Sequence, residues 1–399
     1  MKQKWKTFDF TLMFTPIILS LFGIMMIYSA SMVIAVKQGY PANYYMMKQI
    51  VSFSIGFVLF TFCCFFNYRH YQSLMKIVIG ILFIMLIAVL FEDPVKGARS
   101  WLNIGGFSVQ PAEFVKLGLI MYLASVYAKK QNYISNFGTA VLPPLVMTGL
   151  LLGLIMFQPD YGTAAIIFLI VCSVIFSSGI RWRHLSILIT AGIIFLVVAS
   201  LTLMNSRLTR VTGAYEPFSD AEDSGYQLIQ SYLAIGTGGL DGVGLGQSIQ
   251  KLGYLTEAHN DFIMAVIAEE LGFIGVAVVL SLIALIVLRG LYIARKCQDT
   301  FGSLLAIGIS SMVGIQTFIN LGSISGLLPI TGVTLPFISY GGSSLLVLMA
   351  AMGILNNVAR HVKKANLEPR DQHEQTTNKP LNKTANSSGI QQKRWQGQA

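Results

Sequence analysis

The sequence predicts an all-α integral membrane protein, a bundle of about ten transmembrane helices. Of its 399 residues, 54% are hydrophobic and only 12% are charged, whereas a soluble domain carries about 25% charged residues. The apolar residues also occur in long runs, as membrane-spanning helices require. They do not alternate every second residue, as the strands of a membrane β-barrel do.

Ten apolar runs are interpreted as spans. The first is too long for a cleavable signal peptide and lacks a small-residue cleavage site. The runs occupy residues 10–34, 46–66, 75–91, 113–128, 139–157, 161–179, 185–204, 261–288, 303–322 and 342–359.

The basic residues orient these spans. Lys2, Lys4 and Lys6 precede the first run, and most of the 28 Lys and Arg residues fall in alternate loops on that side or after the last run. Because cytoplasmic loops carry an excess of Lys and Arg, both termini are predicted to be cytoplasmic. Residues 1–364 would form the polytopic membrane domain. Residues 365–399 are polar and offer too little apolar surface to order themselves, so they are predicted to be a disordered cytoplasmic tail.

Composition also limits the function. The net charge of +10 follows from this topology, and the clustered basic face that a nucleic-acid-binding domain needs is absent. The four cysteines show no spacing that indicates zinc or a disulfide. Polar chemistry is expected on the outer face, where three connections are long: residues 92–112, 205–260 and 323–343. Of these, only 205–260 is large enough to fold.

Three carboxylates mark the eighth run. Asp261 lies at its mouth, and Glu269 and Glu270 lie roughly 12–13 Å deeper if the helix is continuous. Ionised groups at such depth are costly unless they are paired or hydrated, so this helix is expected to line a polar site. The plain alternative is that Asp261 only caps the helix, with His259 as a satisfied polar neighbour.

Glu113 and Lys116 lie three residues apart at the start of the fourth run, so they share a helix face and can pair. A structural ion pair is the ordinary interpretation. Lys116 is also the one cation that the sequence places near a span interior, and Glu269 and Glu270 require a cation. A network shared by all four residues is therefore a second hypothesis.

Further polar groups lie in the outer loops. Arg99 and Trp101 suit either an interfacial anchor or a phosphate and sugar site, and Arg207 and Arg210 form a second cation pair. Residues 236–246 are rich in glycine but lack the GxxxxGK[ST] pattern of a nucleotide-binding loop. We interpret them as a flexible or re-entrant turn.

Six stretches in order resemble the SEDS family (shape, elongation, division and sporulation), and the resemblance covers roughly residues 8–360. The Gly-rich stretch and the one after it are more similar to the division-type members than to the elongation type. Asn260 stands where Thr is common, and Thr256 where Pro is common. The stretches are residues 99–104, 110–116, 158–162, 238–246, 250–263 and 328–344.

The resemblance implies a peptidoglycan glycosyltransferase that polymerises lipid II at the outer face of the bacterial cytoplasmic membrane during septal synthesis. It maps the essential carboxylate onto Asp261, as general base. Because the donor carries a lipid diphosphate leaving group, an inverting displacement needs one base and no second carboxyl as acid. Arg99, Arg207, Arg210 or a divalent cation (Mg or Mn) would bind the diphosphate. The implied partners are a class B penicillin-binding transpeptidase and other divisome membrane proteins.

The residues expected to bind substrate form a wider set drawn from the outer loops and from the ends of the spans beside them. They are Arg99, Trp101, Glu113, Lys116, Arg207, Arg210, Gln227, Lys251, His259, Ser339 and Ser343.

Three alternatives to this function stay open. Buried Glu113, Lys116, Glu269 and Glu270 would also suit the translocation path of a lipid II flippase. The tail and outer loops would suit a division scaffold. An elongation-type polymerase would use the same chemistry at another place in the cell.

Overall fold

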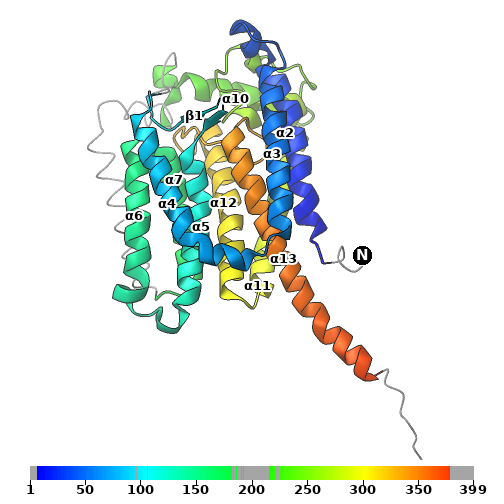
Figure 1. Ribbon diagram of the computed structural model, residues 1–399. Coiled ribbons are helices and arrows are strands. Elements are labelled where there is room, and N and C mark those ends of the chain that lie inside the picture. The colour runs from blue at the N-terminus through cyan, green and yellow to red at the C-terminus, as the bar shows by residue number, and fades with distance from the viewer. Residues whose placement is uncertain are drawn as a thin grey trace, which may run out of the picture.

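In the computed structural model the chain forms a bundle of helices that run roughly alongside one another (Figure 1). The structure describes residues 7–94, 97–105, 107–181, 215–221 and 225–377, with a few isolated positions between 182 and 214. The predicted span at 185–204 lies outside these residues. Each of the other nine predicted runs coincides with a described helix.

Eight of the described helical segments are long and apolar enough to cross a membrane, and α7 is a shorter apolar helix. Some are extended by a turn of another helix type: η1 (Tyr68–His70) and η2 (Val89–Phe91) flank α4, and η4 (Phe137–Val141) precedes α6. The helices are α2 (Phe10–Lys37), α3 (Tyr44–Phe65), α4 (Tyr71–Ala88), α5 (Pro111–Lys129), α6 (Leu142–Phe157), α7 (Tyr161–Ser177), α11 (Ile263–Lys296), α12 (Thr300–Ile324) and α13 (Gly342–Thr377).

Smaller elements cover one end of the bundle. The strands β1 (Leu102–Ile104) and β2 (Phe107–Val109) form an antiparallel hairpin in which Asn103 faces Ser108. The helix α10 (Tyr226–Gly238) lies at this same end (Figure 1). The chain leaves α13 at the opposite end, where α2 begins. By the predicted topology the hairpin end is the outer end, and the other is the inner end.

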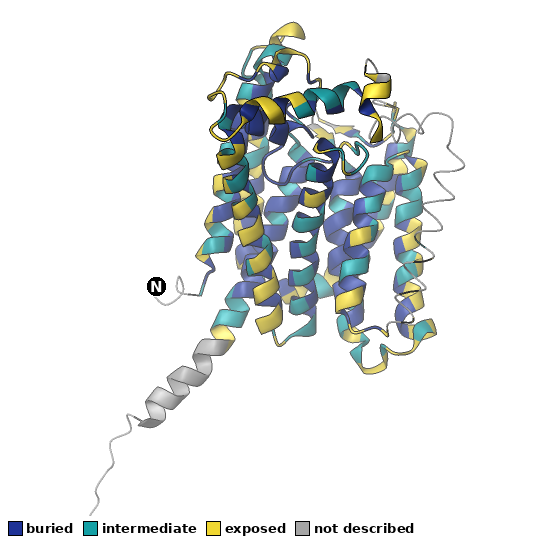
Figure 2. Cartoon of the chain, turned by 180° about the vertical axis from the view of Figure 1, so that it is seen from behind, coloured by how far each residue is buried: buried dark blue, intermediate teal, exposed yellow. Residues whose placement is uncertain are grey.

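The most buried helices are α5, α12 and α13. Buried residues, coloured dark blue, predominate in the interior of the bundle in Figure 2, whereas the peripheral helices expose apolar residues. Phe62 on α3 and Leu288 on α11 are 59% and 66% exposed. Such an apolar exterior is what contact with lipid requires, because lipid offers no partner for polar groups.

Helix α11 is broken at Gly272, where φ is 63° and ψ is −164°. The glycine-rich segment supplies the hydrogen bonds that the helix loses there. Val243 N donates to Glu269 O at 2.9 Å, and Phe273 N donates to Gly239 O at 2.9 Å. A Cβ on Gly242, whose φ is 80°, would lie 2.3 Å from Glu270 O, so only glycine allows this approach.

The break corrects the sequence analysis. The expectation of one continuous span over 261–288 is wrong, because Glu269 and Glu270 lie on a short segment that ends at the kink. The chain is helical from Ile263 up to the break, so the break lies beyond both carboxylates, and their depth of roughly 12–13 Å stays a prediction. Residues 236–238 end α10, and the turn that follows pairs its backbone with the broken helix. A turn is therefore confirmed, and its re-entrant form stays a prediction.

At the inner end, Asp9 joins three helices. Its carboxylate accepts bonds from Arg289 at 2.8 Å and pairs with Lys363 at 3.3 Å, and it caps α2 through Leu12 N. Burial raises the pKa of Asp9, but the Arg289 bond and the Lys363 charge together hold it below its usual value. Helix α13 runs to Thr377, so the predicted boundary at residue 364 is not a helix end. Residues 378–399 lie outside the described chain, and the order of the tail stays a prediction.

Candidate functional site

Asp261 lies at the outer end, immediately before α11. The helix has Phe262 as its N-cap, so Asp261 is not the N-cap residue of α11. The residue is 9% exposed. Asn320 of α12 fixes its backbone, because the Nδ2 group donates to Asp261 O and to Val333 O, each at 2.7 Å.

The irregular segment 325–341 packs beside Asp261. Gly332 lies next to the Asp261 carboxylate, since a Cβ built on it would be 3.9 Å from Oδ2. Tyr340 N donates to His259 O at 2.9 Å. From α3, Gln49 Nε2 donates to Ser339 O, and Gly341 N donates to Gln49 Oε1, both at 3.3 Å. Irregular backbone near membrane depth is tolerated where protein satisfies it in this way.

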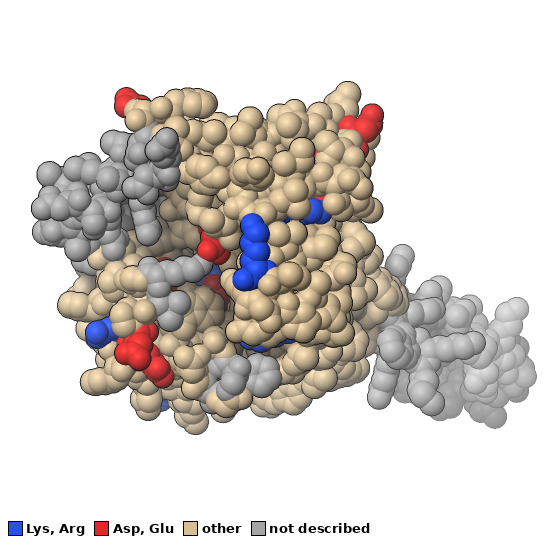
Figure 3. All heavy atoms as spheres, turned by 90° about the horizontal axis from the view of Figure 1, so that it is seen from above, with Lys and Arg blue, Asp and Glu red and all other residues tan. Residues whose placement is uncertain are grey.

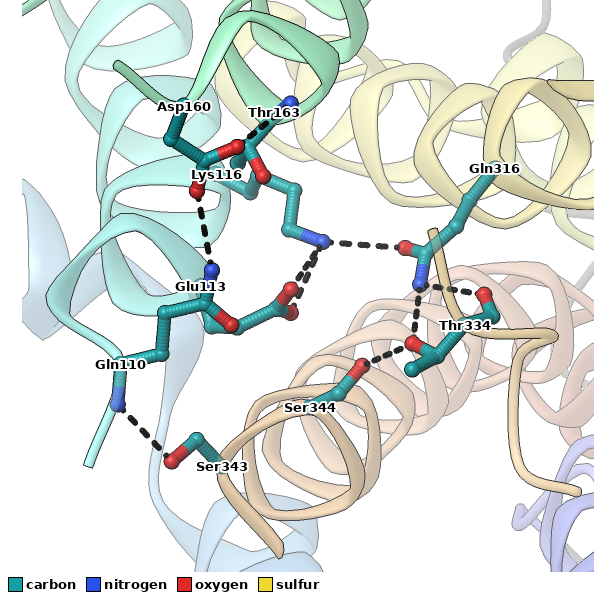
Figure 4. Close-up of polar contacts among 9 residues, drawn as sticks. All are labelled: Gln110, Glu113, Lys116, Asp160, Thr163, Gln316, Thr334, Ser343 and Ser344. Carbon is teal, nitrogen blue, oxygen red and sulfur yellow. Dashed lines mark hydrogen bonds and ion pairs between the residues drawn. The ribbon is translucent and has the colours of Figure 1, made fainter. Parts of the chain in front are cut away.

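Glu113 and Lys116 form the predicted ion pair. Lys116 Nζ lies 2.8 Å from Glu113 Oε2, and both side chains are buried. Figure 4 shows the pair continuing to Gln316 of α12: Lys116 Nζ donates to Gln316 Oε1 at 3.2 Å, and Gln316 Nε2 donates to Thr334 O at 3.0 Å. Gln316 and Asn320 are one turn apart on α12. The pair and the backbone of Asp261 are therefore held by the same helix face.

A second group of contacts joins the hairpin to α7 and α13 (Figure 4). Gln110 N donates to Ser343 Oγ at 3.1 Å, and Gln110 Nε2 donates to Asp160 Oδ2 at 3.0 Å. Asp160 also caps α7 by accepting from Thr163 N at 3.2 Å. Ser343 is 4% exposed, so in this structure its hydroxyl holds the hairpin against α13.

The network predicted to join Lys116 to Glu269 and Glu270 is wrong. Glu270 pairs instead with Lys251 at 2.6 Å, and Ser29 Oγ of α2 donates to the same Glu270 oxygen at 2.7 Å. Glu269 accepts bonds from Ser248 Oγ and from Ile249 N. Residues 248–251 thus hold both carboxylates, and the cation comes from this loop and not from α5.

Lys251 is 1% exposed in this pair and Glu270 is fully buried. We expect Lys251→Met to lower the stability of the protein by about 3–5 kcal/mol, because it leaves Glu270 as a buried charge without a counter-ion. Lys251→Met combined with Glu270→Leu should recover most of the loss. Thermal unfolding in detergent measures both, with Lys296→Met at the exposed inner end as the control. Equal destabilisation by the single and double changes would contradict the assignment.

The remaining predicted residues are more scattered. Arg99 is exposed, and its Nη1 donates to Leu90 O at 3.1 Å. Gln227 Nε2 donates to Thr256 Oγ1 at 2.6 Å, which ties α10 to the loop before Asp261. Arg207 and Arg210 lie outside the described residues. Trp101 is partly buried beside β1.

Seen from the outer end, the molecule is hollowed near its middle, and acidic and basic atoms lie deep in the hollow (Figure 3). Ser339 is 5% exposed, and its Oγ accepts from Leu335 N at 2.8 Å. Within the described part of the chain, no three His, Cys, Asp or Glu side chains converge as metal ligands. A divalent cation therefore stays a prediction, and it would need ligands from the substrate.

Sequence reasoning missed the three amides that hold the site together: Gln49, Gln316 and Asn320. Each is at most 1% exposed. The sequence could have singled them out, because each amide stands inside an otherwise apolar run. Tyr340 was missed as well. Burial and the neighbouring Tyr45 and Tyr44 raise its pKa to about 12. The phenol therefore stays protonated at neutral pH and can donate a hydrogen bond.

A model of the family described as "Cell cycle protein", whose name combines FtsW, RodA and SpoVE, matches residues 10–364. The chain belongs to the SEDS family. It is 50% identical over 378 residues to a Bacillus subtilis protein named "Probable peptidoglycan glycosyltransferase FtsW", covering 91% of this chain and 93% of that protein. It is 39% identical to the stage V sporulation protein E of the same organism, covering 88% and 97%.

Solved structures agree with the fold. One, described as a peptidoglycan synthase complex that coordinates polymerization and crosslinking, matches with a TM-score of 0.72 and 30% identity, over 89% of this chain and 98% of that one. The rod shape determining protein RodA of Thermus thermophilus matches with a TM-score of 0.66 and 28% identity, over 88% and 97%. The predicted multi-pass helical membrane fold is thus confirmed.

Proposed function

We propose that the protein is a peptidoglycan glycosyltransferase that polymerises lipid II at the outer face of the cytoplasmic membrane. The observation that carries the proposal is the fixed position of Asp261 at the outer end, in a chain half identical to a relative named for this activity. The carboxylates of Glu113 and Glu270 are each paired with a lysine of the protein, and the further bonds of these pairs go to neighbouring helices. These contacts therefore favour a structural role for these residues, in support of the site, over the translocation path of a flippase.

Asp261 would act as the general base. It takes the proton from the acceptor hydroxyl as that oxygen attacks the anomeric carbon of the donor sugar. The bond from that carbon to the lipid diphosphate breaks, the configuration inverts, and the diphosphate leaves with its electron pair. Because this leaving group is already stable as an anion, no protonated carboxyl is needed opposite Asp261.

The diphosphate requires positive charge. Of the three arginines predicted to bind it, Arg99 is exposed at the outer end. Arg207 and Arg210, which lie outside the described residues, are proposed to bind it as well. Mg²⁺ is commonly held by one or two carboxylates together with substrate phosphates. Because Asp261 is assigned to accept the proton, such a cation would be held mainly by the substrate phosphates, where it would stabilise the charge of the departing diphosphate.

The test is a polymerisation assay with purified protein and labelled lipid II, analysed on gels with and without a class B penicillin-binding transpeptidase. Glycan polymer is the expected product. Flipping of lipid II in vesicles without polymer would support the transporter instead. A protein that binds its partner but neither polymerises nor flips would be a scaffold.

We assign the protein to septal synthesis together with a class B transpeptidase and other divisome proteins. The division assignment is supported by the relatives named FtsW, of which one is 50% identical, against 28% for the RodA structure. The transpeptidase is supported by the similarity to a complex that couples polymerization to crosslinking. Fluorescent fusions tracked through the cell cycle would distinguish septum from side wall.

Removing residues 366–399 is expected to leave polymerisation by the purified protein nearly unchanged. The tail is predicted to be cytoplasmic, and a bilayer core of about 30 Å separates that side from Asp261. The truncated chain keeps Lys363 and its ion pair with Asp9. The measurement compares full-length and truncated protein in detergent at equal transpeptidase concentration. A several-fold loss of rate would show that the tail belongs to the catalytic machinery.

A further inference from the structure

Five aromatic rings form a continuous cluster that ends beside Asp261. The ring centroids of Tyr40 and Tyr44 are 4.2 Å apart and stacked, and those of Tyr44 and Tyr45 are 5.2 Å apart. Tyr45 lies 4.6 Å from His259 and 5.2 Å from Tyr340. Tyr340 and His259 are themselves 5.6 Å apart. We name these five residues the aromatic ledge.

The ledge leads from solvent into the site. Tyr40 is 46% exposed, whereas His259 is 6% exposed and stands two residues before Asp261. Tyr44, Tyr45 and Tyr340 have intermediate exposure. The connection between α2 and α3, which carries Tyr40, projects beyond the outer end of the bundle (Figure 1). The outermost ring therefore stands on the water side of the predicted membrane surface.

The outer rings are held in place. Lys48 Nζ lies 4.5 Å from the centroid of the Tyr44 ring, a cation–π contact. Tyr45 OH donates to Gln38 Oε1 at 2.6 Å. Tyr44 is thus covered by Tyr40 and Lys48, which leaves the outward side of Tyr40 as the most accessible aromatic surface of the ledge.

Tyrosine near a membrane surface commonly serves as an interfacial anchor. Such anchors need no contact with one another or with a catalytic segment. Here the rings come from three separate parts of the chain, residues 40–45, 259 and 340, and they meet at the backbone bond from Tyr340 N to His259 O. That arrangement is specific to the site.

We propose that the aromatic ledge is a carbohydrate subsite, which binds sugar rings of the glycan on the approach to Asp261. A pyranose ring has a face of C–H groups that packs on an aromatic ring, whose own face carries partial negative charge. The phenol groups are suited to bond the hydroxyl and acetamido groups at the edge of the sugar. Pockets of this kind combine aromatic walls with a few polar groups that fix orientation.

This inference rests on the proposed function for the identity of the glycan, and the experiment separates the two. The probe is a soluble, lipid-free peptidoglycan tetrasaccharide. Its binding to full-length protein in detergent is measured by saturation-transfer NMR, in the Asp261→Asn background so that turnover does not interfere. Polymerisation of lipid II is measured in parallel with Asp261 intact.

Tyr40→Ala and Tyr44→Ala are expected to weaken tetrasaccharide binding about fivefold, and Tyr40→Phe, which keeps the ring, is expected to weaken it less than twofold. In the polymerisation assay both alanine variants should raise KM for lipid II and leave kcat nearly unchanged. Tyr254→Ala is the matched control, because Tyr254 is 51% exposed in the same outer loop region and takes no part in the ledge.

The inference is overturned if Tyr40→Ala and Tyr44→Ala bind the tetrasaccharide as Tyr254→Ala does, even where lipid II is polymerised normally. It is also overturned if the alanine variants lower thermal stability without changing binding, since the rings would then serve packing alone. Binding that depends on Tyr40 in a protein that does not polymerise would support the ledge and refute the proposed function.

Discussion

Asp261→Asn is expected to abolish lipid II polymerisation while leaving the fold intact. The amide keeps the shape of the carboxylate and loses its basicity, and general-base catalysis commonly contributes about 10²–10⁴-fold to the rate. The bond that fixes this residue uses its main-chain oxygen, to which Asn320 donates at 2.7 Å. The substitution therefore leaves the positioning contact in place and removes the base.

The measurement is the amount of glycan polymer on gels from purified protein, together with thermal unfolding. Asp241→Asn is the matched control, because Asp241 is an exposed acid in the same outer loop region. It should polymerise as the unmodified protein does. Polymer from Asp261→Asn at the unmodified level would refute Asp261 as the base, and a large loss of thermal stability would make its role structural.

The spans could be predicted because the thickness of a bilayer dictates the length of an apolar helix. The Glu113–Lys116 pair could be predicted for a similar reason, since three residues on a helix bring two side chains to one face. Both are local properties of the chain.

The errors involve contacts that no local pattern encodes. The eighth span was predicted to be continuous, but it breaks at Gly272. The loop 239–244, about 30 residues away in the chain, forms the backbone hydrogen bonds that the helix loses there. The partner of Glu270 was also misassigned, since Lys251 stands 19 residues earlier in the chain and comes within 2.6 Å of it through the fold of the loop. A buried carboxylate predicts that a cation is near, and the fold decides which one.

The ion pair of Lys116 with Glu113 provides the second large effect. Lys116→Ala should destabilise the protein by about 3–5 kcal/mol, because it leaves a buried carboxylate without its counter-ion. It also removes the donor to Gln316 Oε1 at 3.2 Å. Lys129→Ala is the matched control: Lys129 is exposed at the other end of the same helix, and its loss should change little.

The double change Glu113→Leu with Lys116→Leu separates folding from catalysis. It removes both charges, so it should restore most of the stability measured by thermal unfolding in detergent. Gln316 then loses its bond from Lys116, which orients the amide toward Thr334. Thr334 belongs to the segment that packs beside Asp261. We therefore expect the double variant to fold and to polymerise lipid II poorly. If it is no better folded than Lys116→Ala, the two residues are not a simple pair. If it folds and polymerises normally, the pair serves only the fold, and segment 325–341 holds Asp261 without it.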